Sequence, residues 1–135
     1  MVVDAQGGGL GKQLISNIKK ELTSVHIIAI GTNSIATSAM LKAGADEAAT
    51  GENSVAVASR KADIIIGPIG MVIADSMIGE ITPEIARTIA QADARRILIP
   101  FNTCDNYIVG VSDFNTGYLI QDALTKLKNC LTEEH

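Results

Sequence analysis

Short runs of branched aliphatic residues alternate with segments of helical periodicity along this chain of 135 residues. The run at residues 64–66 consists of three isoleucines without polar alternation, as expected for a parallel strand buried on both faces. Such alternation predicts a parallel sheet with helices on its faces. We therefore expect an α/β fold in a single domain, residues 1–135. Its predicted architecture is a three-layer Rossmann-like sandwich with a mostly parallel sheet of five or six strands.

The individual elements follow from local patterns. Strands are expected at residues 1–3, 25–30, 47–50, 64–66, 97–99 and 107–111. Helices are expected where apolar residues recur every three to four positions, at residues 10–22, 35–41, 54–61, 83–90 and 120–131. Hydrophobic residues make up 47% of the chain and aromatic residues only 3%, so branched aliphatic side chains and alanine must fill the core.

The turns that follow the expected strands differ in composition from those that precede them. Turns from helix to strand are short and plain, at residues 23–24, 45–46 and 93–94. Turns after strands are rich in Gly, Asn, Thr and Pro, at residues 4–11, 31–34, 50–53, 67–70 and 100–106. In a parallel sheet these second turns share the carboxyl edge, where open α/β sheets bind ligands. The sequence thus predicts a binding site at this edge.

The turn between the first strand and the first helix is the richest in glycine. This glycine loop contains Gln6, Gly7, Gly8, Gly9, Leu10 and Gly11. Glycine lets a backbone turn sharply and approach a ligand, and the N–H groups that begin a helix attract anions. We expect the loop to hold the phosphates of a nucleotide. The alternative is a tight turn that binds nothing, although so many glycines carry a high entropic cost for a turn alone.

Two phosphate-binding patterns are similar to this loop, and neither matches completely. The dinucleotide pattern Gly-x-Gly-x-x-Gly has its third glycine where this chain has Lys12. The P-loop pattern ends in Gly-Lys followed by Ser or Thr, whereas Gln13 follows Lys12 here. We therefore expect NAD or NADP as the cofactor, with a P-loop-like NTP-binding protein as an alternative.

The turn after the second expected strand contains small polar residues, Thr32, Asn33 and Ser34, and no carboxylate for ribose hydroxyls. This composition suits a 2′-phosphate and favours NADP, while NAD, a flavin and a mononucleotide stay open. The same residues also suit a simple helix cap. The turn after the central strand, which lies beside the glycine loop if the strand order is 3-2-1-4-5, contributes Gly67, Pro68 and Gly70.

Charge and composition argue against several classes of partner. The net charge is −4 and the basic residues form only short pairs, so we expect no nucleic acid partner. No apolar run approaches the ~20 residues of a membrane span, and the first residues lack the features of a signal peptide. The two cysteines, Cys104 and Cys130, have no metal-binding or disulfide spacing. We therefore expect no metal site and a reducing, cytoplasmic location.

Residues with catalytic chemistry are few, so the sequence leaves open whether the chain is an enzyme. His26 begins the second expected strand, at the edge opposite the predicted site. Cys104 lies at the site edge, but Asp105 beside it does not favour a reactive thiolate. We interpret residues 71–81, which carry Asp75 and Glu80, as a lid, an extra strand or a subunit interface. A homo-oligomer is expected, and a non-catalytic regulatory or assembly protein is the alternative function.

Several stretches taken together resemble one family. They are residues 4–11, 31–40, 49–53 and 67–70, with further support from residues 99–102 and 108–111. The combination is similar to a small bacterial Rossmann-like family of unknown function, domain of unknown function 3842, over nearly the whole chain. The resemblance carries no activity with it. This chain enters the glycine loop after only two or three strand residues, which departs from the family and predicts a weak first strand.

Overall fold

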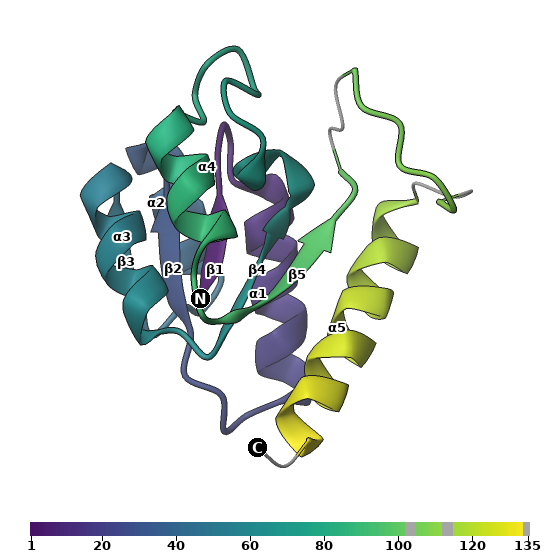
Figure 1. Ribbon diagram of the computed structural model, residues 1–135. Helices are drawn as coiled ribbons and strands as arrows, with labels where there is room; N and C mark the ends of the chain where they lie inside the picture. The colour runs from purple at the N-terminus through teal and green to yellow at the C-terminus, as the bar shows by residue number, and fades with distance from the viewer. Residues whose placement is uncertain (102–104, 112–114, 134–135) are drawn as a thin grey trace.

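The computed structural model describes residues 1–101, 105–111 and 115–133. Its centre is a sheet of five parallel strands in the order β3-β2-β1-β4-β5 (Figure 1). The strands are β1 Val2–Asp4, β2 Ile28–Gly31, β3 Glu47–Thr50, β4 Ile64–Pro68 and β5 Arg95–Ile99. The helices are α1 Gly9–Glu21, α2 Ser34–Lys42, α3 Glu52–Lys61, the short 3₁₀ helix η1 Ile69–Val72, α4 Pro83–Ala90 and α5 Thr116–Thr132.

Helices cover both faces of the sheet, and the sheet separates two hydrophobic cores. The core on one face contains the apolar residues of α1, α2 and α5, and the core on the other face contains those of α3 and α4. Figure 1 shows α4 in front of the sheet and α1 behind it. The structure therefore confirms the predicted three-layer α/β sandwich, with a sheet that is entirely parallel in the part of the chain described.

The first strand is short, as the sequence predicts, yet it lies at the centre of the sheet. It pairs with β2 on one side and β4 on the other, and all its residues are buried. Val2 packs into one core and Val3 into the other, as alternating strand residues must. The carbonyl of Met1 extends the pairing by accepting a 2.9 Å hydrogen bond from the Ile66 amide. Pairing on both sides and burial on both faces thus compensate for the short length of β1.

Two expected strands differ from the structure. The second begins at Ile28 instead of residue 25, so His26 precedes the strand. Residues 107–111 form turns and irregular backbone, with a hydrogen bond from the Val111 amide to the Ile108 carbonyl. Tyr107 and Val109 are almost fully exposed, so their β propensity has no packing partner to act on among the described residues.

The strand order creates a switch point at the carboxyl edge between β1 and β4. From β1 the chain proceeds through β2 to β3 on one side, then crosses to β4 and β5 on the other. Ligands of open α/β sheets bind where the order reverses in this way. The fold therefore brings the glycine loop next to the turn that follows β4, as expected for the order 3-2-1-4-5.

Candidate functional site

The glycine loop lines a cavity of about 280 Å³ at this switch point. Gln6 to Leu10 line it, together with Pro68 at the end of β4 and with Met77 and Phe101 from the segments after β4 and β5. Gln13, at the position where a P-loop has Ser or Thr, also lines the cavity. The structure therefore places a hollow directly over the start of α1, on the predicted edge of the sheet.

Two of the loop glycines are required by packing inside the protein. Gly8 has a left-handed backbone with φ of 74°, and an added Cβ would lie 2.8 Å from the Cα of Ala36 in α2. At Gly11 an added Cβ would lie 2.6 Å from the Met40 sulfur and 3.1 Å from the Asp4 Cβ. These contacts bring α1 close to α2 and the end of β1, and they account for glycine at both positions.

The other two loop glycines have no such role. An added Cβ at Gly7 or Gly9 meets nothing within 4 Å, and neither residue has a positive φ. Both are exposed and both line the cavity. Within residues 1–101, 105–111 and 115–133, the N–H groups of Gly7 and Gly9 have no hydrogen-bond acceptor. Packing within the protein therefore leaves room for a Cβ at Gly7 and Gly9. Both residues nevertheless expose bare backbone to the cavity.

The carboxylate of Asp4 ties the loop to the end of β1. Its two oxygens accept 2.8 Å hydrogen bonds from the amides of Ala5 and Gly11, and the residue is only 5% exposed. Burial raises the pKa of Asp4 above its ordinary value, the two amide hydrogen bonds oppose this shift, and the charge of Glu80 adds to it. A buried acid therefore lies directly beneath the loop.

A second carboxylate reaches the loop from the segment after β4. Residues 73–81, which we call the strap, place Glu80 beside the turn that follows β2. Glu80 accepts hydrogen bonds from the Gln6 amide and, at 2.7 Å, from the Thr32 hydroxyl. The amide nitrogen of Asn33 lies 3.3 Å from its other oxygen. Of the interpretations of this segment, the structure therefore favours a cover over the site edge of its own chain.

The remaining predicted site residues divide between packing and the site edge. Asn33 caps α2 by accepting from the Ala36 amide, and its side chain also donates to the Gln6 carbonyl at 2.9 Å. Ser34 is exposed at the start of α2. An added Cβ at Gly67 would lie 2.5 Å from the Val3 carbonyl, and one at Gly70 would lie 2.9 Å from the Met77 methyl. Strand and strap packing thus explain these two glycines.

The other candidates for chemistry lie away from the cavity. His26 is at the opposite edge, as predicted, where its ring nitrogen lies 2.7 Å from the Glu47 carboxylate. Cys130 on α5 contacts the Arg95 guanidinium at 3.7 Å. Cys104 lies outside the described residues. Ser76 in the strap donates to the Gly70 carbonyl at 2.6 Å, which holds the strap against η1.

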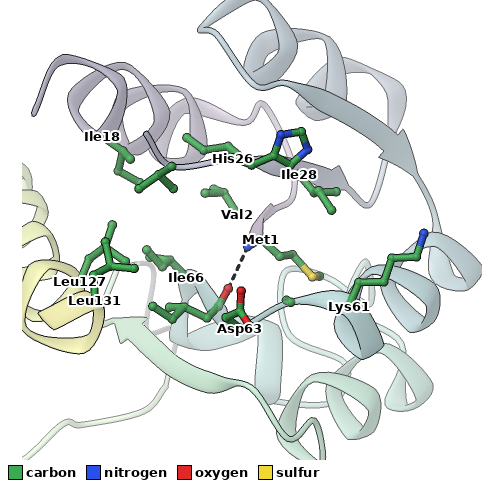
Figure 2. Close-up of a pocket in the computed structure, with 14 residues that line it drawn as sticks. Met1, Val2, Ile18, His26, Ile28, Lys61, Asp63, Ile66, Leu127 and Leu131 are labelled. Carbon is green, nitrogen blue, oxygen red and sulfur yellow. Dashed lines mark hydrogen bonds between the residues drawn. The ribbon is translucent and has the colours of Figure 1, made fainter. Parts of the chain in front are cut away.

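A separate cavity of about 190 Å³ opens at the amino edge of the sheet (Figure 2). Figure 2 shows the side chains of Val2, Ile18, Ile66 and Leu127 around it. The Met1 nitrogen at its rim already donates to the Ile64 carbonyl at 2.8 Å. This lining is mainly aliphatic, and the cavity lies at the edge where the turns are short and plain. We therefore place the candidate site at the carboxyl edge.

The fold and the glycine loop together define the chain as a parallel α/β protein with a cavity at the switch point of its sheet. The family described as "Domain of unknown function (DUF3842)" matches residues 1–132, and the chain belongs to that family. No curated protein and no solved structure matches the chain.

Among the residues described, no helix combines the length and the apolar character needed to cross a membrane.

The division between the loop glycines predicts that one added methyl group has a large effect on stability at Gly8 and a small one at Gly7. Gly8→Ala must hold a left-handed backbone and press against Ala36, so we expect a loss of about 2 kcal/mol or more in the free energy of unfolding. Gly7→Ala should change it by no more than about 0.5 kcal/mol. Urea denaturation followed by circular dichroism measures both. Equal losses of stability in the two variants would contradict the conclusion that packing requires glycine at position 8 and not at position 7.

The buried Asp4 predicts how stability depends on pH. Because its pKa is raised in the fold, its contribution is complete below the ordinary value of 3.8 and is lost as pH rises through the raised pKa. Asp4→Asn cannot ionise, so its free energy of unfolding relative to wild type should increase between pH 4 and pH 7. Urea denaturation across this range measures the slope.

A control variant separates this slope from general pH effects. Arg87 lowers the pKa of the exposed Glu84, so Glu84→Gln should give a relative stability that falls slightly over the same range. A constant difference between Asp4→Asn and wild type across the range would contradict the account of Asp4.

Proposed function

We propose that this protein binds a nucleotide, NAD or NADP, with its phosphates on the backbone amides of the glycine loop. The observation that carries this proposal is the division among the loop glycines. Packing explains Gly8 and Gly11, whereas Gly7 and Gly9 face open space beside a cavity. A ligand that approaches the backbone closely would explain glycine at these two positions, because any side chain there would keep the ligand away.

The electrostatics of the loop suit a phosphate. α1 is 13 residues long and carries no acidic residue in its first turn. The Asp4 carboxylate already accepts from the Gly11 amide, so the N–H groups left to attract an anion include those of Gly7 and Gly9. Among the described residues that line the cavity, none is Lys or Arg. Binding therefore depends on the amides of the loop, as in dinucleotide-binding turns.

The size of the cavity limits what it encloses. A volume of about 280 Å³ is slightly below the usual range for a site that encloses a whole drug-sized ligand, roughly 300–1,000 Å³. We propose that the cavity takes the phosphates and part of the ligand. The remainder extends along the edge toward Thr32, Asn33 and Ser34, which the strand order brings alongside the loop.

Two alternatives have specific observations for or against them. A P-loop-like NTP site needs a hydroxyl after the lysine to hold Mg²⁺, and Gln13 at that position argues against it. A regulatory or assembly protein is favoured by exposed apolar side chains in the loops after β4 and β5, at Ile78, Tyr107 and Val109. A second copy of the chain covering these side chains is the homo-oligomer we propose.

The experiment is a titration of wild type and Gly9→Ala with NAD, NADP, FAD and ATP by isothermal calorimetry. We expect wild type to bind NAD or NADP and the variant to bind at least about tenfold more weakly, about 1.4 kcal/mol, because the added methyl group keeps the phosphate from the backbone. The stability of the variant should be unchanged or up to about 1 kcal/mol higher. No binding of any nucleotide to wild type at millimolar concentration would refute the proposal.

The exposed α5 variant Thr125→Ala serves as the control, because it removes a hydroxyl and a methyl group from the surface far from the loop in sequence. It should bind as wild type does. An equal loss of affinity in Thr125→Ala and Gly9→Ala would show that the ligand does not contact the loop.

A further inference from the structure

The sequence places no carboxylate at the end of β2, but the fold brings one there. Glu80 comes from the strap after β4 and is 48 residues from Thr32 in sequence. It accepts from the Thr32 hydroxyl, contacts the Asn33 amide, and accepts from the Gln6 amide on the loop. Gln6 lines the cavity and Glu80 does not, so Glu80 lies next to the cavity, on the side of the turn that follows β2.

The strap holds Glu80 firmly in this place. Met77 and Ile81, which precede and follow it in the strap, are buried in the core between the sheet and helices α3 and α4. The Asp75 amide closes the strap with a 2.7 Å hydrogen bond to the Ile81 carbonyl. Ile78 has a φ of 58°, a conformation that β-branched residues rarely adopt, and it persists because these contacts fix the backbone. Glu80 is therefore preorganised beside the turn.

This arrangement leaves hydrogen-bond acceptors on Glu80 and Thr32 with capacity for further donors. Within the part of the chain that the structure describes, one Glu80 oxygen receives the Gln6 and Thr32 hydrogen bonds, while Oε1 receives only the 3.3 Å contact from Asn33. A carboxylate oxygen has room for two donors, and the Thr32 hydroxyl can accept while it donates. Two hydroxyls on adjacent ligand carbons would find acceptors here.

We infer that Glu80 receives the ribose hydroxyls of the bound dinucleotide, so that the site takes NAD and rejects NADP. This inference rests on the proposed nucleotide function. An acidic residue after β2 has this role in dinucleotide-binding folds, and here the strap supplies it. A 2′-phosphate would bring about two negative charges against the Glu80 carboxylate, and no Lys or Arg bonds to Glu80, Thr32 or Asn33 among the described residues.

The test compares NAD⁺ and NADP⁺ on wild type, Glu80→Gln and Glu80→Asp by isothermal calorimetry. Wild type should bind NAD⁺ at least about tenfold more tightly than NADP⁺. Glu80→Gln should bind NAD⁺ about fivefold or more weakly and NADP⁺ within about twofold of wild type, because repulsion is lost with the charge. Glu80→Asp keeps the charge and should keep the preference for NAD⁺. Glu84→Gln removes an exposed carboxylate at the start of α4, and this variant should bind both nucleotides as wild type does.

The outcomes separate this inference from the proposal on which it rests. If both nucleotides bind wild type with equal affinity, or if Glu80→Gln leaves the preference unchanged, the role of Glu80 is refuted while nucleotide binding stands. If Glu80→Gln strengthens the binding of both, the carboxylate only competes with the ligand, and the inference fails. If neither nucleotide binds wild type, the proposed function and the inference fail together. Thermal melting of each variant confirms that it is folded.

Discussion

The hydrogen bonds from the Ala5 and Gly11 amides to the Asp4 carboxylate fix the centre of this structure. β1 has only three residues, and its last one is the acid that connects the sheet to the first turn of α1. The close approach of Gly8 to Ala36 then sets the distance between α1 and α2. With the loop held from below by Asp4 and from the side by α2, the backbone at Gly7 and Gly9 is the part that faces outward.

The site is completed by elements that are distant in sequence. Reversal of the strand order between β1 and β4 brings the segment after β4 to the loop, and Glu80 then bridges the loop and the end of β2. Two carboxylates, Asp4 and Glu80, therefore approach the loop from different sides. The burial of Asp4, and to a lesser extent the charge of Glu80, makes ionisation of Asp4 less favourable. A phosphate bound at this point has to satisfy the outward amides while it avoids both acids.

The sequence predicts most of the fold because its signals are local. The aliphatic runs, the helical spacing of apolar residues at 83–90 and the glycine loop each depend on a few neighbouring residues, and the structure confirms the strand, the helix and the turn that they predict. The expected strand at residues 107–111 is wrong because β propensity depends on a packing surface that Tyr107 and Val109 do not have among the described residues.

The place of Glu80 could not be predicted because it depends on contacts across the fold. Its partners Thr32 and Gln6 are 48 and 74 residues away. The left-handed turn that positions it uses Met77 and Ile78, residue types that give no turn signal. Residues 71–81 are interpreted from the sequence as a lid, an extra strand or a subunit interface, and the burial of Met77 and Ile81 in the core of their own chain explains part of the apolar character of this segment. The different roles of the loop glycines could not be predicted from the sequence either. Gly8 and Gly9 differ in backbone conformation and in their distances to neighbouring atoms, which only the folded structure shows.

The most direct measurement of the central claim is an NMR titration of the ¹⁵N-labelled protein with NAD⁺. Amide protons that gain a hydrogen bond to phosphate shift downfield, so the account predicts the largest downfield changes at Gly7 and Gly9. The amides of Gly8 and Gly11, which already donate to Ala5 and Asp4, should move little. Saturable shifts confined to other parts of the chain, with Gly7 and Gly9 unmoved, would contradict the claim that the outward backbone of the glycine loop binds the ligand.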